Sequence, residues 1–178
     1  DDCVPGPDFF PFCSDLLERY REEDQVMHIS GSCHNLAPMP HSYRFSRYPH
    51  IWGWATWARA WKDHDDHDPL TRATLTTLLV DRFEDPRERE FWTLIFDCVT
   101  SGKIDTWDYP WLFHLLVRDG LSITPTQNLV TNIGFGESAT HTTQASSRHA
   151  DMPTQSIPFP LDHPDHLIVD AVGDREVA

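Results

Sequence analysis

Hydrophobic residues recur at helical spacing near the start of the chain. Between residues 9 and 20 the large apolar side chains fall three or four positions apart, and Asp8 stands where an N-cap residue belongs. This pattern predicts an amphipathic helix over residues 8–21. A short apolar run at 26–29 then predicts a strand, and the stretch 32–42, with two prolines and no periodicity, predicts a loop. The alternation of strand and helix indicates an α/β protein.

The middle of the chain is mainly helical in pattern. The predicted elements are, in order, a strand at residues 43–46 and helices at 55–61, 72–83, 86–101 and 109–118. The helix over 86–101 starts with Pro86, which is favoured in a first helical turn, and stops before Gly102. These helices lie between the strand patterns, which keeps the prediction in the α/β class.

The last third of the chain loses its apolar pattern. Residues 121–125 alternate as a strand does, and residues 128–135 form a second extended piece. Beyond them the chain is rich in Ser, Pro, His and Asp. We therefore expect one folded unit over residues 1–144 and a poorly ordered arm or tail over 145–178, with one docking patch at 157–161.

Composition narrows the class of protein. A chain of 178 residues can bury the core of one domain, and its net charge of −14 argues against nucleic acid or an anionic membrane as partner. No signal peptide and no apolar run long enough to span a membrane is present. The four cysteines have no close CxxC spacing, which favours reduced thiols and a cytoplasmic location.

The chain opens on two adjacent carboxylates, Asp1 and Asp2, directly before the first predicted helix. The junction between a strand and a helix is where α/β sheets present ligand-binding groups. Carboxylate oxygens suit Mg²⁺ or Mn²⁺, which take substrate phosphates as further ligands. The alternative is a solvated acidic pair, which is common on protein surfaces.

The tryptophans and arginines near the middle of the chain are candidates for ligand contacts. Trp52, Gly53 and Trp54 could form a platform for a sugar, because aromatic faces stack on pyranose rings and glycine allows close approach. We expect Trp57 and Trp61 to pack inward. Tryptophan at helical spacing is more often core, which is the alternative for the whole group.

Two arginines, Arg44 and Arg47, could contact phosphate or acceptor, although surface arginines usually do neither. The turn at residues 64–68 has metal-ligand residue types but no fixed scaffold, and we interpret it as a solvated helix end.

Several motifs together carry a family resemblance. They are DDCVP and PDFF within residues 1–10, HISG at 28–31, SRYPHIWGWATW at 46–57, WDYPW at 107–111 and NLVTNIGFG at 128–136. In this combination the chain resembles the bacterial nucleotide-diphospho-sugar transferases related to glycosyltransferase family 2, some of which carry the name haemolytic protein. The order of motifs is also similar to that in the N-acetylglucosaminyltransferase I family. The resemblance covers residues 1–142.

The resemblance implies a GT-A fold, a Rossmann-like nucleotide-sugar domain of which residues 1–144 would be the C-terminal portion. It implies that Asp2 binds Mn²⁺ or Mg²⁺ and that Asp1 faces the ribose, or the metal through water. The family's preceding acidic residue and upstream half-sheet are absent, so we expect an N-terminally truncated chain. Expressed alone, such a fragment is expected to be inactive and prone to aggregation.

Asp108 matches the general base of inverting GT-A enzymes, which takes the proton of the acceptor hydroxyl. A helix start directly after this residue would favour its charged form. The alternative role is a helix cap, and Asp105 is the second candidate for the base. His141 matches a late histidine near the metal or diphosphate in these families. With eleven histidines in the chain, a chance match is the alternative.

The sequence therefore predicts a metal-dependent hexosyltransferase that moves a monosaccharide from a nucleoside diphosphate sugar to a glycan or lipid-linked hydroxyl, with inversion. One rival is a metal-dependent phosphoester hydrolase, which would need further acidic strand ends for two metals. The other is a non-catalytic carbohydrate-binding or interaction module in which the tryptophans bind the sugar.

Overall fold

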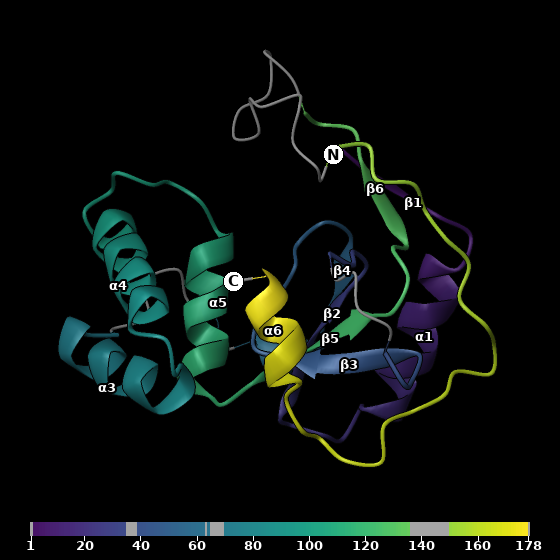
Figure 1. Ribbon diagram of the computed structural model, residues 1–178, viewed down its shortest axis with the longest axis horizontal. Helices are drawn as coiled ribbons and strands as arrows, with labels where there is room; N and C mark the ends of the chain where they lie inside the picture. The colour runs from purple at the N-terminus through teal and green to yellow at the C-terminus, as the bar shows by residue number, and fades with distance from the viewer. Residues whose placement is uncertain (1, 35–38, 63, 65–69, 136–149, 178) are drawn as a thin grey trace.

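The chain has a mixed α/β fold in a computed structural model that describes residues 2–34, 39–62, 64, 70–135 and 150–177 (Figure 1). The elements are β1 (Cys3–Pro5), α1 (Phe9–Arg19), β2 (Val26–Ser30), β3 (Tyr43–Ser46), β4 (Trp54–Ala55), α2 (Ala58–Trp61), α3 (Arg72–Arg82), α4 (Pro86–Thr100), α5 (Asp108–Val117), β5 (Leu121–Pro125), β6 (Val130–Asn132) and α6 (Ala171–Val177). The α/β class predicted from the sequence is confirmed.

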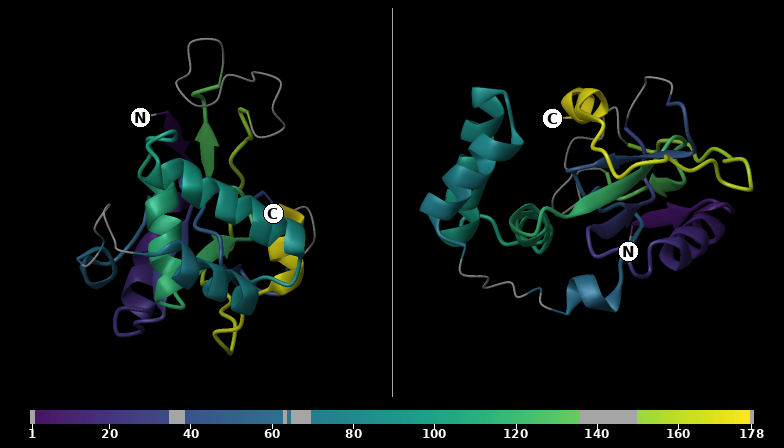
Figure 2. Two further views of the ribbon diagram at one scale, coloured as in Figure 1. Left: turned by 90° about the vertical axis from the view of Figure 1, so that its left-hand side faces the viewer. Right: turned by 90° about the horizontal axis from the view of Figure 1, so that it is seen from below.

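The main sheet has four strands in the order β3-β5-β2-β4. The central strands β2 and β5 are parallel, whereas β3 and β4 are antiparallel to their neighbours. All five residues of β2 and of β5 are buried, because both faces of the sheet are covered. Figure 2 shows α1 on one side of the sheet and α6 on the other. The main core forms where α1 packs on the strands, around Phe12, Leu16, Ile29, Phe45 and Ile123.

A separate two-stranded sheet joins the start of the chain to the segment after β5. Cys3 pairs with Asn132 and Pro5 with Val130, in antiparallel register. The Ile133 amide then donates to the Asp2 carbonyl oxygen at 2.9 Å. Asp2 is therefore held beside the end of β6, in a small sheet of its own rather than in the main sheet.

Three helices stand beside the sheet and share a second core. Leu75, Leu79, Trp92 and Phe96 of α3 and α4 pack against one side of α5. The other side of α5 faces the sheet through a smaller buried cluster of Met27, Ala60, Trp111 and Leu115. Helix α5 thus lies between the two cores, and Figures 1 and 2 show it between the α3–α4 pair and the sheet. The three helices predicted over residues 72–118 are confirmed to within one residue at each end.

The predicted helix over 55–61 is only partly correct. Trp54 and Ala55 pair with Ser30 and Ile29 as the edge strand β4, and the helix is limited to the single turn of α2. The reason is Gly53, whose positive φ of +63° turns the chain so that the next two residues run alongside β2.

The C-terminal segment differs from the poorly ordered arm that its composition predicts. Ile157 and Leu161 are buried in the main core, so the docking patch expected at 157–161 is confirmed. The Ile157 amide donates to the Asp8 carboxylate at 3.0 Å, and Val169 forms a parallel bridge with Phe45 at the edge of β3. Residues 150–177 therefore pack along the sheet and end in α6, while the boundary proposed at residue 145 lies outside the described residues.

None of the helices in the described part of the chain has the length and apolarity needed to cross a membrane.

Candidate functional site

An open groove of about 1830 Å³ lies between the small sheet, the loop after β3, the helical layer and α6. Asp2, Trp52 and Asp108 line this groove, although they come from three separate parts of the sequence. Gly53 and Trp54 are not among its lining residues. Asp1 and His141 lie outside the described residues, and nothing in the structure bears on their roles.

Asp2 is fixed by its backbone and presents an exposed carboxylate to the groove. Its side chain lies against Gly134, where any added Cβ would overlap the carboxylate. The Gly134 amide donates to Asn132 Oδ1 at 2.8 Å, which holds this turn in place. Glycine is therefore required at position 134 to leave room for the Asp2 side chain.

The surroundings of Asp2 indicate which kind of metal site is feasible. Among the described residues, no three His, Cys, Asp or Glu side chains are placed together to hold a metal ion. Mg²⁺ is commonly bound by one or two carboxylates, several waters and substrate phosphates. Asp2 alone fits a cation of that kind, which takes its other ligands from water and from a phosphate of the substrate. It does not fit a metal held by protein groups only.

Asp108 is the first residue of α5, and its two carboxylate oxygens have different environments. Oδ1 accepts hydrogen bonds from the Thr106 hydroxyl and, at 2.9 Å, from the Tyr109 amide. Oδ2 has no hydrogen-bond partner among the residues that the structure describes. The carboxylate is thus held by one oxygen while the other is available, so its contact with the helix start and a role in the groove are compatible.

Asp105, the second candidate for the base, lines the same groove and is exposed. No hydrogen bond from a described residue holds its carboxylate. Asp108 is therefore the better oriented of the two.

The tryptophan platform predicted from the sequence is divided in the structure. Trp52 lines the groove, where its ring meets His34 and Phe135 edge-on at 5.2 and 5.4 Å. Trp54 is stacked on His28 and also on Trp107, with ring centroids 5.2 Å apart in each pair. Trp54 is half-buried in this stack and does not line the groove, whereas Trp107, which is 39 % exposed, does.

Gly53 serves the fold at this point. A Cβ there would overlap Val130, and the Gly53 carbonyl accepts from the Gly31 amide at 2.7 Å. Of the two tryptophans expected to pack inward, Trp57 is buried, whereas Trp61 keeps 40 % of its surface exposed. His64, expected in a solvated turn, instead packs on the Trp61 ring with centroids 4.6 Å apart.

A buried histidine supports the tryptophan stack from inside. His28 Nδ1 accepts from Trp111 Nε1 at 3.0 Å, and its Nε2 donates to the His50 carbonyl at 3.1 Å. Since indole can only donate, this arrangement requires the neutral ring with its proton on Nε2. Burial lowers the pKa of His28 to about 4. His28 is thus a neutral structural residue at neutral pH.

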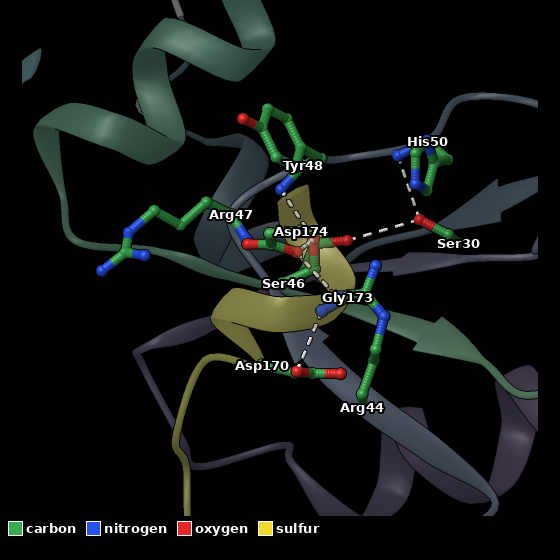
Figure 3. Close-up of polar contacts among 10 residues, drawn as sticks. Ser30, Arg44, Ser46, Arg47, Tyr48, His50, Asp170, Gly173 and Asp174 are labelled. Atoms are coloured by element: carbon green, nitrogen blue, oxygen red, sulfur yellow. Dashed lines mark hydrogen bonds and ion pairs between the residues drawn. The ribbon is translucent and has the colours of Figure 1, made fainter. Parts of the chain in front are cut away.

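The two candidate arginines have different environments (Figure 3). Arg44 is buried, and its guanidinium donates to Asp174 Oδ1 at 2.6 Å. The same carboxylate accepts from the Ser46 hydroxyl at 2.6 Å and, through Oδ2, from the Arg47 amide at 2.9 Å. Arg47, by contrast, places its side chain in the groove. Arg44 therefore holds α6 against β3, and of the two arginines Arg47 is the one that lines the groove.

Glu88, His34 and His50 are among the polar groove residues that sequence reasoning missed. Burial, with a smaller contribution from Asp174, raises the pKa of the Glu88 carboxyl. No sequence signal distinguishes Glu88 from the other charged residues of its helix. His50 could have been found, because it lies inside the aromatic run that also contains Trp52.

A scan of family models and searches of curated proteins and of solved structures found no match to this chain. The groove therefore has to be interpreted from its own chemistry.

Proposed function

We propose that the protein is a metal-dependent glycosyltransferase that moves a monosaccharide from a nucleoside diphosphate sugar to a hydroxyl acceptor, with inversion. The observation that carries this proposal is the shared groove: a carboxylate suited to a phosphate-bound cation, an aromatic wall and a second carboxylate with a free oxygen line one cavity. The mixed sheet with helices on its sides is compatible with the GT-A fold, which is part of the proposal.

Asp2 would hold Mn²⁺ or Mg²⁺ on the donor side of the groove, and Asp1 and His141 belong to the same proposed site. A bound cation of this kind neutralises the negative charge that develops on the departing diphosphate. Trp52 and Trp107 offer aromatic surface for the sugar rings.

Asp108 would act as the general base. Its Oδ2 would accept the proton of the acceptor hydroxyl as that oxygen attacks the anomeric carbon, while Thr106 and the Tyr109 amide keep Oδ1 in place. The exposed apolar side chains of Val80 and Phe91 also line the groove, which suits an acceptor with an apolar portion such as a lipid-linked glycan. A cytoplasmic location is part of this proposal, and it agrees with four cysteines that are free of disulfides.

The decisive experiment separates donor binding from transfer. Made in the protein at its natural full length, Asp108→Asn is expected to bind the donor normally but to lower transfer by roughly 10² to 10⁴, since a positioned general base is lost. Asp105→Asn is the matched control in the same groove and should have a much smaller effect. If Asp105→Asn were the variant that binds but does not transfer, the base would be assigned to the wrong carboxylate.

The metal role is tested on Asp2. Asp2→Asn, made in the protein at its natural full length, is expected to remove the Mn²⁺-dependent part of nucleoside diphosphate binding, because the amide brings a weaker ligand and no charge. Calorimetry with and without Mn²⁺ measures this difference. Equal affinities for the variant and the unmodified chain would take Asp2 out of the metal site.

A non-catalytic carbohydrate-binding protein is the second candidate, favoured by the exposed ring of Trp107 on the groove wall. Oligosaccharide binding that persists in EDTA and is lost in Trp107→Ala, with no turnover of any nucleotide sugar, would favour it over the transferase.

A further inference from the structure

The groove is strongly acidic for a site that would bind a diphosphate. Its lining carboxylates are Asp2, Asp81, Glu84, Asp85, Glu88, Asp105, Asp108 and Asp174, and its arginines are Arg47, Arg82, Arg87 and Arg175. A phosphate that enters such a groove needs a cationic partner that is not already neutralised by a neighbouring carboxylate.

Three of these four arginines are already paired. Arg82 contacts Asp119 at 2.6 Å, Arg87 contacts Asp85 at 2.8 Å, and Arg175 lies 3.7 Å from Glu84. The Arg47 guanidinium has no hydrogen bond or ion pair with the described residues. Arg47 is thus the groove arginine whose five donors are still available.

The base of the Arg47 side chain is held rigidly. The Arg47 amide donates to Asp174 Oδ2 at 2.9 Å, and the following amide, of Tyr48, donates to the buried Ser46 hydroxyl at 2.9 Å. Figure 3 shows the Arg47 side chain pointing away from the carboxylate of Asp174 and from Arg44. The anchor that binds Arg44 therefore also fixes the direction in which Arg47 leaves the backbone.

We propose that Arg47 binds a phosphate group of the ligand in this groove. The planar guanidinium can donate two parallel hydrogen bonds to phosphate oxygens, which a single ammonium group cannot do. The identification of this group as the diphosphate of a sugar donor rests on the proposed function. The assignment of an anion-binding residue rests on the pairing of the other three arginines and on the fixed backbone of Arg47.

Glu88 is the acidic residue that opposes this role. It lines the same groove, and the positive charge of Arg47 acts on its carboxyl, lowering a pKa that burial and Asp174 raise. The two side chains make no ion pair in the structure. A charged Glu88 therefore repels a phosphate at Arg47, and its removal should strengthen binding.

The test uses inorganic pyrophosphate as the probe, the full 178-residue chain, EDTA to exclude metal, and calorimetry at low salt. Arg47→Gln is expected to weaken pyrophosphate binding by roughly tenfold or more, since charge-assisted hydrogen bonds are lost. Arg47→Lys should give an intermediate affinity, because the charge is kept and the fork is lost.

Two matched variants in the same groove complete the experiment. Arg87→Gln makes the same change of charge at an arginine already paired with Asp85, and should change the affinity less than about twofold. Glu88→Gln should tighten binding by a few fold. Urea unfolding of each variant checks that the fold is intact.

The outcomes separate this inference from the proposed function. Absence of pyrophosphate binding by the unmodified chain, or equal losses in Arg47→Gln and Arg87→Gln, overturns the role of Arg47 even if transfer depends on Asp2 and Asp108. Binding that depends on Arg47 in a protein that turns over no nucleotide sugar keeps the anion site and removes the transferase.

Discussion

The sheet half of this protein is held together by contacts between residues far apart in the sequence, whereas the helical half is held together by contacts between elements that follow one another in the chain. In the helical half, residues 70–117, helices α3, α4 and α5 pack on their neighbours in the chain, and each begins or ends at a local signal. In the sheet half, formed by the remaining described residues, β2 pairs with β5, and Arg44 is joined to Asp174 near the C-terminus. The groove lies between these two halves and takes groups from both.

This difference has a consequence for the candidate site. The sheet half presents Asp2 and Arg47 from backbone that is held by distant partners, and Trp52 directly before Gly53, whose carbonyl accepts from Gly31; the helical half contributes Asp108 at the start of a helix. Groups that must recognise a ligand with fixed geometry therefore depend on the long-range contacts. Variants that break such contacts should therefore lower the free energy of unfolding the most.

The largest effect is expected at the link between α6 and β3. Asp174→Ala would leave the Arg44 guanidinium buried without its carboxylate, and the loss of one partner of a buried ion pair typically costs about 3 to 5 kcal/mol. Urea unfolding followed by circular dichroism measures the free energy of unfolding. Asp165, on the same segment, is exposed, and Asp165→Ala should stay within about 0.5 kcal/mol. Similar values for the two variants would mean that α6 contributes little to the sheet half.

The second effect concerns the contact between the halves, where Trp111 of α5 donates to His28 of β2. The folded-state pKa of His28 is about 4, below the ordinary value of 6.5, so the unfolded chain takes up a proton before the folded protein does. The contribution of neutral His28 to the free energy of unfolding is fully present above about pH 6.5. It falls as the pH drops towards 4, by about 3 kcal/mol in total.

The measurement compares the native chain with His28→Asn, which keeps an acceptor for Trp111 but cannot take up the proton. The variant should be less stable at pH 7, and the difference in unfolding free energy should shrink as the pH falls to 4. Parallel stability curves for the two proteins over this range would show that His28 does not titrate as its burial implies.

The same contrast in contact range explains how far the sequence could predict the fold. Pro86 at a first helical turn and Gly102 after a helix, where the structure has a φ of +69°, are signals within a few residues of the boundaries they set. Strand β5 was predicted with its observed limits for the same reason. The docking patch at 157–161 could be predicted from its apolar residues, but the path of the following segment along the sheet could not, because its contacts, such as the bridge between Val169 and Phe45, join residues more than a hundred positions apart.

Part of the candidate site could likewise be predicted from the sequence. Asp2, Trp52 and Asp108 each stand in a motif, and the structure places all three in one groove. The different roles of the two arginines, with Arg44 buried against Asp174 and Arg47 in the groove, could not be foreseen. They depend on Asp174, a polar residue in a polar segment. The stacking of Trp54 likewise depends on Trp107, which lies far along the chain.

The smallest expected effect tests the local character of the helical half. Thr71 is the N-cap of α3, and its hydroxyl accepts from the Thr74 amide at 3.2 Å. Thr71→Ala removes this partner from an otherwise unsatisfied amide and should cost about 1 kcal/mol. Thr76, inside the same helix and also exposed, instead bonds its own helix backbone at Arg72.

Thr76→Ala is therefore the matched control with the opposite expected sign. Alanine is the better helix former, and the hydroxyl contact that Thr76 makes with its own helix backbone slightly disfavours the helix. The free energy of unfolding of this variant should therefore rise by up to about 0.5 kcal/mol. The two Thr→Ala changes differ only in position along α3, and thermal or urea unfolding resolves their difference of roughly 1 to 1.5 kcal/mol. Because the helical half depends on signals of this local kind, both variants should leave pyrophosphate binding at Arg47 unchanged. A loss of binding in Thr71→Ala would show that the start of α3 controls the groove as well as its own helix.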